Sequence, residues 1–201
     1  MHLRKILVLL PLLPALAIPG LGTLIAAGLV IVALFAFSDA RQATFTRGPW
    51  LRSLGIGAIS GVAIAVLMGM VVNDLLAKLF GQASDFSAFN SVKGNTAEYV
   101  RLLLLGLVYG PVVEEIIFRG FVIGWGSKLF GQRATPLLAL VSAAVFGITH
   151  WYQGWTGVCS TGIIGLGYGL VYIVSSRNIV AAIFTHMTLN AIGVTELYLG
   201  I

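Results

Sequence analysis

Charged residues are scarce in this chain: they occupy 9% of its 201 positions, whereas apolar residues occupy 58%. An ordinary water-soluble domain carries about 25% charged residues. The deficit therefore excludes a typical soluble domain and indicates a protein that resides in lipid. A helical span needs roughly 20 apolar residues, so the chain has room for about six or seven spans and none for a separate soluble domain.

Cysteine is nearly absent, since Cys159 is the single one. This excludes an intrachain disulfide and a metal site built from several cysteines. Basic residues outnumber acidic ones and give a net charge of +5, but they are scattered between hydrophobic runs. The absence of a basic cluster excludes a nucleic-acid partner. We expect the lipid bilayer to be the main surrounding of the chain.

Apolar runs alternate with short polar or Pro-containing breaks along the whole chain. The sequence predicts an all-α, polytopic transmembrane helical bundle of about six to eight helices that encloses a polar cavity. We expect a single domain over residues 1–201, with N-terminal helices at about 6–80 and a core at about 98–199. The runs cover residues 6–37, 54–77, 99–127, 134–151, 157–175 and 179–199.

The first run is interrupted by prolines and glycines between positions 11 and 22, so it forms either one kinked span or a helical hairpin. It is too long for the apolar region of a signal peptide, and we expect it in the mature protein. The distribution of charge favours the hairpin, because Arg4 and Lys5 then lie on the same, cytoplasmic side as Arg41, Arg47 and Arg52.

Following the spans from this hairpin onward places the other basic loops on the cytoplasmic side as well. The sequence thus predicts a multi-pass protein of a prokaryotic plasma membrane. Aromatic residues at the ends of runs predict interfacial anchors on both sides of the bilayer. The basic loop residues are Lys128, Arg133 and Arg177; the aromatic ones are Trp50 and Trp125 on one side and Trp151, Tyr152 and Trp155 on the other.

Local signals mark one helix start and several close helix contacts. Asn95 followed by Glu98 predicts an N-cap at the start of the third run. Pairs of glycines spaced by four residues predict that helix backbones approach closely. These pairs are Gly57/Gly61, Gly106/Gly110, Gly120/Gly124 and Gly165/Gly169.

Three ionisable residues lie in one predicted span, within the segment 111–121. Such groups are costly in a bilayer and are functional candidates when they occur there. Glu115 and Arg119 are four residues apart, so they can form an ion pair on one helix face. Glu114 points about 100° away from its neighbour and is left without a partner. A helix-packing ion pair explains Glu115 and Arg119 but does not explain Glu114.

Two further spans carry polar residues: His150 in one, and His186 with Asn190 in the other. His186 and Asn190 are four residues apart and share a helix face. A single buried histidine is more often a hydrogen-bonded core residue. Together with Glu114, however, these groups can hydrolyse an amide: the carboxylate as general base, His150 assisting it, and His186 with Asn190 donating to the oxyanion.

In this order the patterns Glu-Glu-x-x-x-Arg, Phe-x-x-x-His and His-x-x-x-Asn resemble those of the CPBP family, over residues 110–195. This family, also called Abi, comprises CAAX prenyl endopeptidases and bacteriocin-processing or self-immunity proteins. The resemblance implies that Glu114 and His150 activate water and that His186 and Asn190 stabilise the oxyanion. It assigns structural roles to Glu115, Arg119 and Phe146. The chain is short for the eight-helix members, so we expect a peripheral helix to be missing.

The sequence does not decide the cofactor or the substrate. No cofactor is firmly predicted, and the resemblance favours metal-free glutamate chemistry. Zinc held by Glu114, His150 and His186 is the alternative. The expected partner is a protein or peptide substrate, which a prenyl group could anchor. Two other functions compete: a catalytically silent membrane scaffold of the same family, and a small proton-coupled transporter, although the internal repeats that transporters usually carry are absent.

Overall fold

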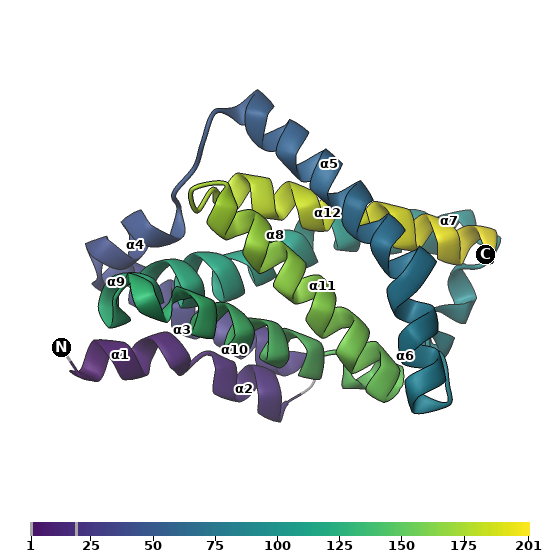
Figure 1. The fold of residues 1–201 in the computed structure, drawn as a ribbon, viewed down its shortest axis with the longest axis horizontal. Helices are drawn as coiled ribbons and strands as arrows, with labels where there is room; N and C mark the ends of the chain where they lie inside the picture. Colours follow the sequence, from purple (N-terminus) through teal and green to yellow (C-terminus); the bar gives the residue numbers. More distant parts are fainter. Residues whose placement is uncertain (1, 19) are drawn as a thin grey trace.

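The protein was analysed as a computed structural model that describes residues 2–18 and 20–201. Helices account for nearly all of these residues, and the described chain contains no strand. The predicted all-α bundle is thus confirmed. The N-terminus lies on one side of the bundle and the C-terminus on the opposite side (Figure 1).

The N-terminal segment folds back on itself. Helices α1 (His2–Leu9) and α2 (Leu12–Ala17) form one arm, and α3 (Leu21–Ala36) forms the other. The arms lie side by side, because α2 packs against α3 and Arg4 Nη1 lies 3.4 Å from Asp39 Oδ1 at the start of α4 (Ser38–Thr44). The structure therefore confirms the hairpin rather than the single kinked span.

Trp125 ties this hairpin to the rest of the bundle. Its side chain is fully buried, stacks on Phe37 with ring centroids 5.6 Å apart, and donates a hydrogen bond of 2.9 Å from Nε1 to Asp39 Oδ2. The prediction that Trp125 is an interfacial anchor is wrong, because the folded hairpin covers it. The other predicted anchor residues remain exposed, namely Trp50, Trp151, Tyr152 and Trp155.

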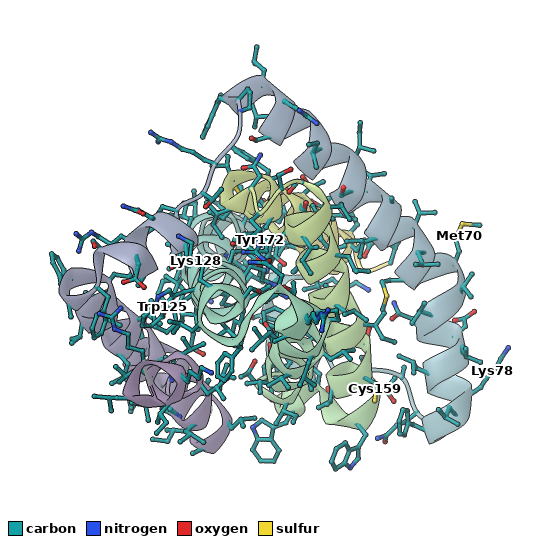
Figure 2. The ribbon with its side chains drawn as sticks, turned by 60° about the vertical axis from the view of Figure 1, so that its left-hand side comes forward. Met70, Lys78, Trp125, Lys128, Cys159 and Tyr172 are labelled. Atoms are coloured by element: carbon teal, nitrogen blue, oxygen red, sulfur yellow. The ribbon has the colours of Figure 1, made fainter. Side chains whose placement is uncertain are left out.

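A long helix runs from Trp50 to Phe80, through α5 (Trp50–Leu67), the π-helical η1 (Met68–Val72) and α6 (Asn73–Phe80). Along α5 it packs on α12 (Ile179–Leu199). Gly57 and Gly61 permit this contact, since a Cβ at Gly57 would lie 2.3 Å from Phe184 Cβ. The opposite side of the helix faces outward, and Met70 and Lys78 project from it (Figure 2).

Two further helices pack against each other beside these elements. Helix α10 (Thr135–Ile148) packs on α11 (Gly154–Val174), which crosses the molecule diagonally (Figure 1). Within residues 2–18 and 20–201, three helices are long and apolar enough to cross a membrane: Trp50–Phe80, Trp151–Val174 and Ile179–Leu199. Leu21–Ala36 and Gln132–Ile148 are shorter apolar helices. The protein is an integral membrane protein.

Basic loops gather at one end of the bundle. Arg4 adjoins Asp39, Arg177 donates a hydrogen bond to Gln132 Oε1, and the loop before α5 bonds to the start of α12 through Ile179 N and Thr46 O at 2.9 Å. These contacts join the segments that carry most of the positive charge. A shared membrane face for them is what the positive-inside pattern predicts.

Candidate active site

One continuous helix of varying pitch carries the two glutamates. It comprises α7 (Thr96–Leu104), the π-helical η3 (Leu105–Tyr109), α8 (Gly110–Glu115), the π-helical η4 (Ile116–Trp125) and α9 (Gly126–Phe130). Asn95 caps its start, because Asn95 Oδ1 accepts from Glu98 N at 3.3 Å, as the sequence predicts. Pro111 has no N–H to donate, and η3 ends two residues before it, at Tyr109. π-Helical turns of this kind are often found at functional sites.

Glu115 and Arg119 form the predicted ion pair. Glu115 Oε1 lies 2.9 Å from Arg119 Nη1, and both side chains are fully buried. Arg119 Nη2 also donates to the carbonyl of Gly165 at 2.7 Å. The guanidinium lies 4.7 Å from the ring centroid of Phe146, so Phe146 contacts the pair directly. A Cβ at Gly165 would lie 2.8 Å from Phe146, which shows why this helix contact requires a glycine.

His186 connects this ion pair to Glu114. Its Nδ1 lies 2.9 Å from Glu115 Oε1, and its Nε2 lies 3.8 Å from Glu114 Oε2. The ionised carboxylate of Glu115 can only accept, so Nδ1 of His186 carries a proton. Tyr168 stacks on the imidazole with ring centroids 4.6 Å apart and fixes its plane. Nε2 is therefore the nitrogen directed toward Glu114.

His150 lies in a turn rather than in a span. Helix α10 ends at Ile148, and His150 precedes the short 3₁₀ helix η6 (Trp151–Gln153). Its Nδ1 lies 2.9 Å from the carbonyl oxygen of Phe146, which can only accept. Nδ1 therefore carries the proton, and Nε2 of His150 keeps its lone pair. The predicted helical run 134–151 therefore ends early, because α10 stops two residues before His150.

Asn190 follows His186 by one helical turn, and both side chains line the same cavity. Asn190 Nδ2 donates to the carbonyl oxygen of Gly106 at 2.9 Å. One amide hydrogen is thus engaged by the helix that carries the glutamates. The second hydrogen is available for another acceptor, because a carboxamide has two.

The cavity has a volume of about 330 Å³ and is lined by His150, His186 and Asn190 together with Phe146 and Tyr168. Glu114 adjoins it through His186, and its side chain is 19% exposed. The structure thus brings together the groups that the sequence singled out on three separate runs. This size is in the range of small ligand and substrate sites.

Sequence reasoning missed a second polar wall of the cavity. Asn73 in α6 accepts a hydrogen bond from Ser160 in α11 at 2.8 Å, and Gln153 and Glu196 also line this side. Each is a polar residue in or beside an apolar run, the signal that identified Glu114. Tyr168 was also missed, because an aromatic residue in an apolar helix gives no such signal.

Counting residues along straight spans predicts that His186 lies at a shallow depth, far from Glu114 and His150. The 3.8 Å separation between His186 and Glu114 shows that this is wrong for that pair. The count assumes helices of uniform pitch, whereas the glutamate helix contains π-helical segments on both sides of α8. It also assumes spans perpendicular to the bilayer, and α11 crosses the bundle obliquely (Figure 1).

The zinc alternative requires Glu114, His150 and His186 to converge on one ion. Across residues 2–18 and 20–201, no three His, Cys, Asp or Glu side chains group closely enough to hold one metal ion. Glu114 and His186 are neighbours, and His150 lines the cavity that His186 also lines. Zinc as a cofactor therefore stays a prediction, which cleavage with and without a chelator would test.

Comparisons with known proteins bear on this geometry. Residues 96–192 match the family model "Type II CAAX prenyl endopeptidase Rce1-like". This segment is similar to the Rce1-like family. It contains every residue of the candidate site, from Glu114 to Asn190, so the resemblance seen in the three motifs is confirmed. The Rce1-like assignment supports a membrane protease of the CAAX type.

A curated relative agrees with the Rce1-like assignment. The chain is 23% identical over 133 residues to the "Putative membrane peptidase YdiL" of Bacillus subtilis (strain 168). The match covers 66% of this chain and 52% of the relative, so it spans about half the length of that protein. No solved structure matches the chain.

Proposed function

We propose that this protein is an intramembrane endopeptidase in which Glu114 activates the attacking water. The observation that supports this most strongly is the arrangement of the two adjacent glutamates. Glu115 is neutralised by Arg119, whereas Glu114 faces His186 at the edge of a cavity that His150 and Asn190 also line. A carboxylate that has no Arg or Lys partner and lies beside a cavity is suited to general-base catalysis.

In the proposed reaction Glu114 accepts a proton from water as the oxygen attacks the peptide carbonyl carbon. His186 Nε2, when protonated, and the free amide hydrogen of Asn190 donate to the oxygen that becomes negative. The C–N bond then breaks, and the proton held by Glu114 passes to the leaving nitrogen. His150 Nε2 has a lone pair and assists in this proton transfer.

The proposed substrate is a membrane-bound protein or peptide cleaved near the bilayer. Candidates are proteins with a prenylated CAAX-type end, bacteriocin or other peptide precursors, and other membrane proteins. We further propose that the basic loops face the cytoplasm of a prokaryotic cell. The gathering of these loops at one end of the bundle supports this orientation.

The decisive experiment is cleavage of a peptide panel by the purified chain in lipid nanodiscs. The panel pairs each peptide with and without a C-terminal prenylcysteine, and each reaction runs with and without a chelator. We expect cleavage that is lost in Glu114→Gln. The matched control is Glu98→Gln, which changes an exposed acid on the same helix and should leave cleavage unchanged.

Full activity of folded Glu114→Gln would reject the catalytic assignment. The absence of cleavage across the panel would favour a silent scaffold. Loss of activity on chelation, restored by zinc, would replace the metal-free mechanism with a metal-dependent one.

A further inference from the structure

A second hollow lies outside the candidate site, between α10 and α11. It has a volume of about 780 Å³ and shares no lining residue with the cavity that contains His150 and His186. Its walls are mostly apolar, and polar side chains are confined to one end. The apolar residues are Leu140, Leu166, Leu170 and Ile173; the polar end has Gln132, Thr135 and Arg177. We call this hollow the α10–α11 groove.

The α10–α11 groove faces the hydrocarbon side of the bundle. Leu140 and Leu170 in its walls are 56% and 52% exposed, and Leu137 and Val174 beside it are 63% and 78% exposed. In an integral membrane protein such apolar side chains contact acyl chains. The groove is therefore accessible to a lipid from the bilayer and needs no entrance from water.

Arg177 gives the groove a positive end. Its guanidinium donates to Gln132 Oε1 and to Thr135 Oγ1, the latter at 3.4 Å. Among the described residues no Asp or Glu forms an ion pair with it. Ser176 and Arg177 both adopt positive φ, 61° and 62°, which is uncommon for residues other than glycine. This turn holds Arg177 where the groove ends.

We propose that the α10–α11 groove binds one anionic phospholipid, with its phosphate on Arg177 and an acyl chain along Leu140 and Leu170. The guanidinium forms paired hydrogen bonds with phosphate oxygens. The headgroup of an anionic lipid has a net negative charge, which neutralises the unpaired Arg177. A zwitterionic headgroup carries a cation of its own, which already balances its phosphate. Arg177 also lies at the end of the bundle where the basic loops gather, and anionic lipids are enriched in the cytoplasmic leaflet.

The test is native mass spectrometry of the full chain with equimolar phosphatidylglycerol and phosphatidylcholine of identical acyl chains. We expect one phosphatidylglycerol to be retained preferentially. Arg177→Gln should weaken this preference by about fivefold, the effect of one basic residue at a membrane surface. Leu170→Trp, which fills the groove, should reduce retention of both lipids. Thermal melting of each variant establishes that it is folded.

Arg133→Gln is the matched control, because Arg133 is an exposed basic residue near the same end and does not line the groove. It should keep the wild-type preference. Equal weakening in Arg133→Gln would show diffuse attraction to charge and overturn the proposal. So would an unchanged preference in folded Arg177→Gln, or displacement of the lipid by inorganic phosphate alone, which would assign the site to a free anion.

Discussion

Glu115 and His186 are joined by a contact of 2.9 Å between Oε1 and Nδ1, although they lie 71 positions apart in the sequence. The same oxygen also contacts Arg119 Nη1 at 2.9 Å. One carboxylate oxygen therefore holds both a structural cation and an imidazole of the candidate site. A change in the ion pair should consequently affect both stability and the orientation of His186.

Arg119→Ala should strongly destabilise the protein. It leaves the fully buried carboxylate of Glu115 without its cation, and breaking such a pair costs about 3–5 kcal/mol. The free energy of unfolding in detergent measures the effect. The control is Arg101→Ala, which removes an exposed pair with Glu98 and should cost less than about 1 kcal/mol. Similar losses in the two variants would contradict the buried pair.

Asn190→Ala should reduce kcat by about 10²–10³, the effect of removing one oxyanion donor. Its stability should fall by only about 1 kcal/mol, the contribution of its hydrogen bond to Gly106. Cleavage kinetics and thermal melting separate the two roles. A large loss of stability with kcat unchanged would make Asn190 purely structural.

Gly57→Ala should destabilise the contact between α5 and α12 by about 1–3 kcal/mol, because the added Cβ would meet Phe184 at 2.3 Å. Gly55→Ala on the same helix has open space around its Cβ and should be neutral or stabilising by up to about 1 kcal/mol. Melting of the two variants side by side is the measurement. Equal midpoints would argue against close packing of these helices.

Asp39 should make stability depend on pH in the acidic range. The hydrogen bond from Trp125, with a further contribution from Arg4, holds the pKa of Asp39 below its ordinary value of 3.8, against an opposing effect of desolvation. The ionised form therefore favours the folded state at neutral pH. This stabilisation is present above pH 3.8 and is lost as the pH falls through the lowered pKa.

Asp39→Asn removes this titration. Melting curves between pH 5 and pH 3 should show a smaller loss of stability in the variant than in the wild-type protein. Parallel losses in the two proteins would mean that the Asp39–Trp125 hydrogen bond contributes no pH dependence.

Much of the fold and site follows from the sequence, because lipid penalises polar groups and makes each one informative. The helix start at Asn95, the Glu115–Arg119 pair and the N-terminal hairpin rest on local spacing and charge, and the structure confirms them. The half-buried carboxylate of Glu114 beside His186 is also found. The catalytic roles stay predictions.

Other features depend on the three-dimensional arrangement and could not be predicted. From its position in the sequence Trp125 resembles an interfacial anchor, but in the folded protein the N-terminal hairpin covers it completely. The π-helical segments beside Glu115 have no residue pattern that marks them, so depths counted along straight helices fail. Stacking of Tyr168 on His186 requires knowledge of which helices are neighbours.

The N-terminal hairpin has a consequence for the route of a substrate. In the described chain, no residue before Ala65 lines the cavity at the candidate site. The hairpin instead contacts the far end of the glutamate helix, through Asp39 and Trp125. A peptide that reaches the cavity therefore does not pass the first forty residues, because later segments of the chain supply the whole described lining. The first forty residues pack instead against the C-terminal half of the helix that carries Glu114 and Glu115.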